Sequence, residues 1–61
     1  MNLSQVAKKL EEASRLLRSS ASAFRHGRYN TAMRTWDRAE DALMEAKALW
    51  SASDTTHEAL G

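Results

Sequence analysis

Residues 17–39 read LRSSASAFRHGRYNTAMRTWDRA and contain the turn that decides the fold. On each side of Gly27, apolar residues recur at alternating steps of three and four, which is the period of a helix face. Gly27 stands where a helix needs a residue in the left-handed conformation to end. Folded back about Arg28, the two series pair a large residue with a smaller one in successive layers: Phe24–Ala32, Ser20–Trp36, Leu17–Ala39, Ala13–Leu43, Leu10–Ala46 and Val6–Trp50. This register predicts two antiparallel helices with a knobs-into-holes seam.

The length of the chain allows one small domain. It has 61 residues, no cysteine to form disulfides and no proline to break a helix. We expect an all-α helical hairpin over residues 1–51, with one helix over about 3–26 and a second over about 29–51. Small side chains that hydrogen-bond to their own backbone follow the second series, so we expect residues 52–61 to form a flexible C-terminal tail.

The apolar surface is wider than one hairpin needs. Beyond the seam, the first helix adds Leu16 and Ala23, and the second adds further residues on both flanks: Met33, Ala42, Met44 and Leu49. A lone hairpin leaves one side of its seam open to water, and so short a chain can hardly offset the entropy of ordering. The pattern therefore predicts a homodimer built as a four-helix bundle. The alternatives are a marginally stable monomer and a hairpin that folds on a different partner.

The sequence offers little material for catalysis or for binding a metal. Ser53, Asp54 and His57 are the residue types of a nucleophilic triad, but a triad needs a rigid scaffold and an oxyanion site, which a tail does not provide. His26 stands among arginines, and no glycine-rich phosphate loop is present. We therefore expect no enzyme activity, no catalytic residue, no cofactor and no metal.

Charged residues occur early in the chain, where a signal peptide or membrane span would be apolar. Lys8, Lys9, Glu11 and Glu12 all lie within the first twenty residues. We expect a cytoplasmic protein that does not interact with a membrane.

Candidate partner-binding residues are the large apolar side chains that the seam leaves over. They are Leu16, Met33, Met44, Leu49 and Trp50. Tryptophan is common at interface hot spots, and Trp50 would close the open end of the hairpin, where it is partly exposed. Trp36, by contrast, faces the small Ser20 in the predicted register and is expected to serve the core.

Basic residues gather near the turn. Residues 13–36 contain five arginines and no acid, whereas residues 37–61 contain six acids against Arg38 and Lys47. Four residues form what we call the basic tip: Arg18, Arg25, His26 and Arg28. Arginine clusters bind phosphates, so a nucleic-acid-binding role remains open, although the net charge of the chain is only +1.

One pattern resembles known families. Gly27, Tyr29, Ala32, Trp36 and Ala39 follow the spacing of the second half of a single tetratricopeptide repeat, with Leu16, Ser20 and Ala23 at the packing positions of its first helix. With Trp50 as the second tryptophan, the same pattern is similar to the AraC negative regulators and the related PerC-like proteins. That resemblance implies a small helical bacterial or phage regulator, of virulence or of a mobile element, that binds a transcription factor rather than DNA.

These observations predict a protein-binding role. We expect a small regulator of transcription that self-associates and binds a larger regulatory protein, such as a transcription factor, through its apolar helix flanks. One alternative is a nucleic-acid-binding protein that uses the basic tip. Another is a structural subunit or a secretion-type co-chaperone that shields a helix of its partner.

Overall fold

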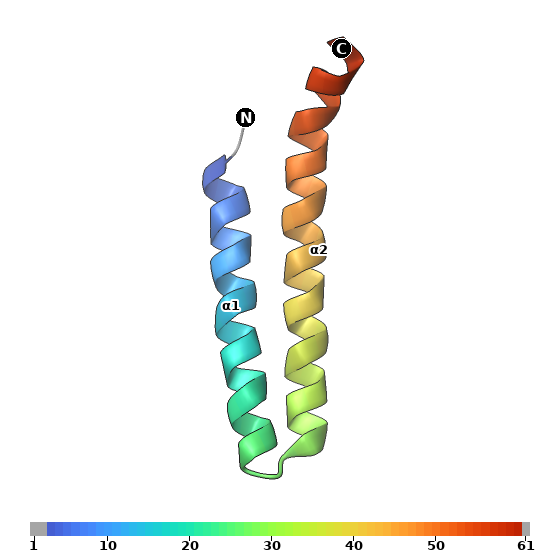
Figure 1. Ribbon diagram of the computed structural model, residues 1–61. Coiled ribbons are helices and arrows are strands. Elements are labelled where there is room, and N and C mark those ends of the chain that lie inside the picture. Colours follow the sequence, from blue (N-terminus) through green and yellow to red (C-terminus); the bar gives the residue numbers. More distant parts are fainter. Residues whose placement is uncertain (1–2, 61) are drawn as a thin grey trace.

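The chain forms a helical hairpin in a computed structural model that describes the backbone of residues 3–60 and the side chains of residues 3–52. Helix α1 spans Leu3–Arg25 and helix α2 spans Tyr29–Leu60. The two helices lie side by side and antiparallel, and α2 extends beyond the start of α1 (Figure 1). The molecule is a rod of 50 × 16 × 11 Å. The predicted all-α hairpin is therefore confirmed.

The second helix is longer than the sequence pattern predicts. Helical backbone continues from the predicted end at residue 51 to Leu60. The sequence predicts a flexible tail over residues 52–61. Only residue 52 of this tail lies in the part of the chain whose side chains are described, so the flexibility of the tail stays a prediction. The side chains of Ser53, Asp54 and His57 lie outside that part as well.

The turn is a complete Schellman motif built on Gly27. This residue has φ of 75°, a left-handed conformation that glycine adopts without strain. The Arg28 amide donates to the Ala23 carbonyl at 2.8 Å, and the Gly27 amide donates to the Phe24 carbonyl at 3.1 Å. The carbonyls of Ala23 and Phe24, near the end of α1, are thereby satisfied. The predicted role of Gly27 as a helix stop is confirmed.

The seam between the helices consists of small side chains. The buried residues of the described part are Ala13, Ser20, Ala32, Ala39, Ala42 and Ala46. The Ser20 hydroxyl donates to the Ala32 carbonyl of the opposite helix at 2.8 Å. Side chains of this size let two helix backbones approach closely.

The predicted pairing of Ser20 with Trp36 is wrong, whereas the predicted pairs Val6–Trp50, Leu10–Ala46 and Ala13–Leu43 line common grooves. Ser20 bonds to Ala32, one turn closer to the loop than its predicted partner Trp36. The predicted core role of Trp36 is also wrong, because 44% of this residue is exposed. The physical reason is that closely packed helices leave no room for an indole between them. The large side chains instead lie along one side of the seam.

Candidate protein-binding face

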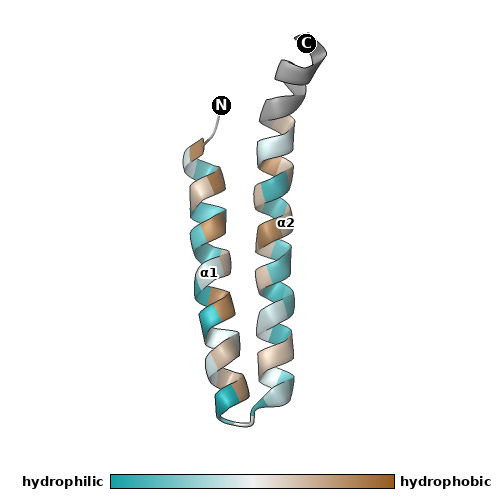
Figure 2. Ribbon diagram, in the orientation of Figure 1, coloured by the Kyte–Doolittle hydropathy of each residue, from teal (hydrophilic) through white to brown (hydrophobic). Residues whose placement is uncertain are grey.

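Eight large side chains repeat at seven-residue intervals and form what we call the apolar face. Leu3, Leu10, Leu17 and Phe24 come from α1, and Tyr29, Trp36, Leu43 and Trp50 come from α2. A seven-residue interval keeps side chains on one side of a helix. In Figure 2, hydrophobic segments recur along the side of α1 that is turned towards α2. Seven of the eight are exposed and Phe24 is half-buried.

Contacts between the two rows show that they share one face. The Phe24 ring lies 6.1 Å from that of Trp36, edge to face, and 6.2 Å from that of Tyr29. An open groove at the middle of the face is lined by Leu10, Ala13, Ser14, Leu17, Arg18, Ala21 and Leu43. A second groove towards the open end is lined by Val6, Leu10, Ala46, Lys47 and Trp50. The face is therefore a continuous ridged apolar surface.

The other side of the seam is closed by polar groups. Lys9 Nζ donates to Glu45 Oε2 at 2.9 Å, which links α1 to α2. The hydrogen bond to Glu45, with the attraction of the Glu45 and Glu12 carboxylates, raises the pKa of Lys9 above its ordinary value. A lysine with its ordinary pKa is already charged at neutral pH, so the pair is intact there without the shift. We call this the polar side after its ion pair; Leu49 also lines the groove beside the pair.

The predicted partner-binding residues do not form one surface. Trp50 belongs to the apolar face, and Met33 lies on its α2 edge, four residues after Tyr29. Met44 lies farther around α2 and is 69% exposed. Leu49 lines a groove with Lys9 and Glu45 on the polar side, and Leu16 lies one helical turn beyond Glu12 of that groove; both leucines are half-buried.

The sequence pattern places most of the apolar face in the seam. Because they continue the helical period, it predicts a core position for Leu10, Leu17, Trp36 and Leu43. The signal that distinguishes them is the contrast between two adjacent heptad series: one of large residues, and one in which small residues such as Ala13, Ser20, Ala32 and Ala39 prevail.

The basic tip is solvent-exposed. Arg25, His26 and Arg28 surround the loop, while Arg18 lies two turns earlier on α1. His26 Nδ1 lies 2.8 Å from the Ser22 carbonyl. Arg18 donates to the Ser14 hydroxyl at 3.2 Å, which places the guanidinium at the edge of the apolar face. The tip is thus a loop cluster with one outlying arginine.

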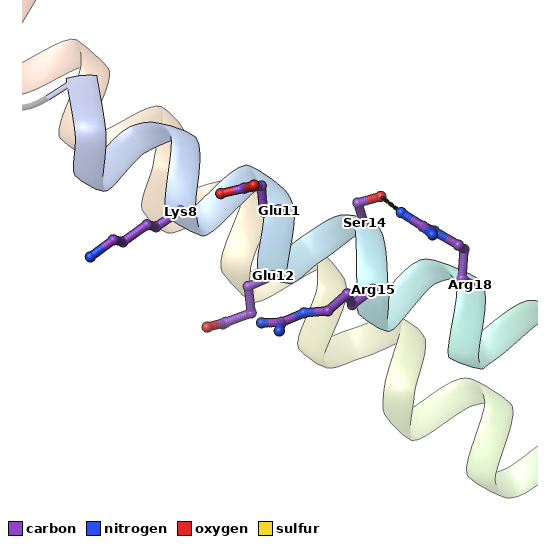
Figure 3. A pocket seen from close by; sticks show the side chains of 6 residues that line it. All are labelled: Lys8, Glu11, Glu12, Ser14, Arg15 and Arg18. Carbon is purple, nitrogen blue, oxygen red and sulfur yellow. Dashed lines mark hydrogen bonds between the residues drawn. The ribbon is translucent and has the colours of Figure 1, made fainter.

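A further depression lies on α1 alone and is polar. Its lining side chains are Lys8, Glu11, Glu12, Ser14, Arg15 and Arg18. Figure 3 shows that Ser14 and Arg18 project to one side of the helix, whereas Glu12 and Arg15 project to the other. Charges of both signs alternate here, as on a solvated helix surface. In the part of the chain that the structure describes, no group of three or more histidine, cysteine or carboxylate side chains could hold a metal ion.

The described helices contain no stretch long and apolar enough to cross a bilayer. No protein family, curated protein or solved structure matches this chain. The resemblance to the AraC negative regulators and PerC-like proteins stays a prediction.

Proposed function

We propose that this chain is a small protein-binding regulator that self-associates through its apolar face. The observation that carries the proposal is the placement of side chains: small residues fill the seam, while two tryptophans and four leucines of the face remain exposed. Burying large apolar and aromatic surface is the main driving force for association. Two hairpins joined by such faces make a four-helix bundle.

Self-association leaves the side of α2 around Met44, which we call the outer edge of α2, for a larger partner. Met44 is 69% exposed and lies farther around α2 than Met33, which borders the apolar face. Methionine is adaptable and is common at surfaces that bind helices. We propose that this edge binds a larger regulatory protein in the cytoplasm, such as a transcription factor; the choice of partner class rests on the resemblance given above.

Leu17→Asp tests self-association. Leu17 lies at the middle of the apolar face, so an interface there would bury the new carboxylate without a partner. We expect dimer affinity to fall by about a hundredfold or more, measured by sedimentation velocity across a concentration series. Met44→Asp is the matched control, because it places the same charge outside the face. If Leu17→Asp sediments like the parent chain, the apolar face does not mediate self-association.

The same two variants separate self-association from binding of the larger protein. In affinity capture from native lysate, Met44→Asp should keep the dimer and lose the larger protein. If Met44→Asp and the parent chain capture the same proteins, the outer edge of α2 is excluded as the binding site for the larger protein.

A nucleic-acid role is the second candidate, favoured by the exposure of Arg25, His26 and Arg28 around the loop. Each phosphate that these side chains neutralise would release counterions and make binding salt-dependent. A capture performed with and without nuclease distinguishes the candidates. The captured partners could be lost after nuclease treatment and also be lost with a chain that carries Arg25→Ala and Arg28→Ala. That result would favour nucleic-acid binding through the basic tip.

A further inference from the structure

We infer that the occupant of the apolar face is a second copy of this chain lying antiparallel to the first, with the two loops at opposite ends of the bundle. This inference rests on the proposed function, because it names the orientation of the copy that covers the same face. Three features carry it: the exposed area, the division of charge between the two halves of the hairpin, and the sizes of the side chains along the face.

The exposed area is larger than that of a compact monomer. The chain exposes 4958 Å², whereas a folded monomer of its mass exposes about 3,950 Å². The excess of about 1,000 Å² is spread over the whole rod, so the chain has ample surface for the roughly 800 Å² that each partner buries in a standard interface. The face also presents two parallel rows of large side chains, which is half of a four-helix bundle core.

Two copies can place these faces together in two symmetric ways. A two-fold axis along the helices brings both loops to the same end and sets α1 beside α2 of the second copy. An axis across the helices sends the loops to opposite ends and sets α1 beside α1 of the second copy. Neighbouring helices are antiparallel in both arrangements, so helix direction alone does not choose between them.

The distribution of charge along the hairpin favours the arrangement with the two loops at opposite ends of the bundle. The loop half of the hairpin, residues 14–39, contains six arginines against one acid, Asp37. The open half, residues 3–13 and 40–52, contains five acids against three lysines. Loops at the same end would place twelve arginines together, whereas loops at opposite ends place each basic half against an acidic half.

Side-chain size favours the same arrangement. Phe24 and Tyr29 lie together at the loop end of the face. With the loops at the same end, four aromatic rings would share one layer, while the leucines Leu10 and Leu43 of both copies would share another. With the loops at opposite ends, Phe24 and Tyr29 meet Leu3 and Trp50 of the second copy. This spreads the volume evenly along the core, as close packing requires.

The α1 edge of the face gives the position of the axis. Ala7, Ser14 and Ala21 repeat at seven-residue intervals, and Ser14 and Ala21 line the central groove. An axis at Ser14 sets Ser14 against its own copy and Ala7 against Ala21, so small residues meet small residues. It also sets Glu11 opposite Arg18 of the second copy, which pairs unlike charges at the rim.

Cysteine cross-linking tests the inference, because the natural chain contains no cysteine. In a glutathione redox buffer, Ser14→Cys should become a covalent dimer through a disulfide across the axis. Ala21→Cys is the matched control on the same helix edge. Its two copies would lie about 21 Å apart along the bundle, so it should not link to itself. An equimolar mixture of Ala7→Cys and Ala21→Cys should link as the mixed product.

Sedimentation of the parent chain measures whether it dimerises, and this result decides how each cross-linking outcome is interpreted. If the parent dimerises and neither Ser14→Cys nor the Ala7→Cys and Ala21→Cys mixture links, the antiparallel inference is wrong while the proposed function stands. If Ser14→Cys links with Glu40→Cys and neither links with itself, the loops lie at the same end. If the parent is monomeric at every concentration, self-association and the inference both fail. Circular dichroism of each variant confirms that the helices remain folded.

Discussion

Ser20 explains why one polar residue interrupts the apolar series of α1. It is buried at the seam, and its hydroxyl donates to the Ala32 carbonyl, so the polar atom keeps a hydrogen bond away from water. The hydroxyl is also small enough for the helices to approach closely at this point. The sequence pattern predicts that position 20 belongs to the core series, and it suggests a small residue there to make space for Trp36. It cannot show that serine is instead needed for the hydrogen bond to the Ala32 carbonyl.

Gly27→Ala tests the other residue on which the hairpin depends. A Cβ at this position would meet no atom within 4 Å, so the substitution carries only the cost of a left-handed φ. We expect the free energy of unfolding to fall by about 1 kcal/mol. Gly27→Asn should lose less, because asparagine adopts this conformation more readily. Urea unfolding at one fixed chain concentration measures both, and equal stability of Gly27→Ala and the parent would contradict the role of φ.

At the scale of the helices, the sequence predicts the hairpin well and the seam poorly. The period of three and four, together with Gly27, identifies two helices and their turn. It does not decide which of two adjacent heptad series faces the other helix, because both are apolar. The series with Ala13, Ser20, Ala32 and Ala39 is buried, since small side chains allow the closer approach. The displaced large residues form the apolar face, so the error in the seam and the missed site have one cause.

Ala39→Leu tests the close approach of the helices. Ala39 is fully buried in the seam, and three additional carbons there would force the backbones apart. We expect the free energy of unfolding to fall by about 1–3 kcal/mol, measured by thermal unfolding at fixed chain concentration. Ala48→Leu makes the same change at an exposed position of α2 and should be nearly neutral. A similar stability of Ala39→Leu and Ala48→Leu would show that the seam is loose.

At the scale of the whole molecule, the structure shows where two features of the sequence lie on the hairpin. The exposed apolar surface gathers on one side of the hairpin, although its residues are those predicted for the seam rather than for the flanks, and the uneven charge becomes a basic loop half and an acidic open half. The sequence predicts a self-associating chain, but it cannot give the orientation of the copies, because that depends on which residues the seam leaves exposed. Hairpin periodicity also does not encode the identity of a larger partner, since its apolar steps are those of any packed helix pair.

Glu40→Gln distinguishes the two dimer orientations by the sign of its effect. Glu40 is exposed on α2, eight residues after Ala32 and four after Trp36, which places it on the α2 edge of the apolar face. In the antiparallel dimer, the two copies of Glu40 lie near the axis and repel each other. Neutralising them should therefore raise dimer affinity several-fold at low salt, with the gain shrinking as salt is added.

With the loops at the same end, Glu40 would instead face Ser14 and the nearby Arg18 of the second copy. Glu40→Gln would then remove an attraction, and dimer affinity would fall. Dilution calorimetry at two salt concentrations measures the sign. Asp41→Gln provides the control, because it lies off the apolar face and removes the same charge from the adjacent residue. The net charge of the chain is +1. Neutralising either acid raises it to +2, so a general effect of net charge would weaken the association of both variants. Tighter association of both variants would show that the gain does not come from repulsion at the axis, and weaker association of Glu40→Gln alone would contradict the antiparallel arrangement.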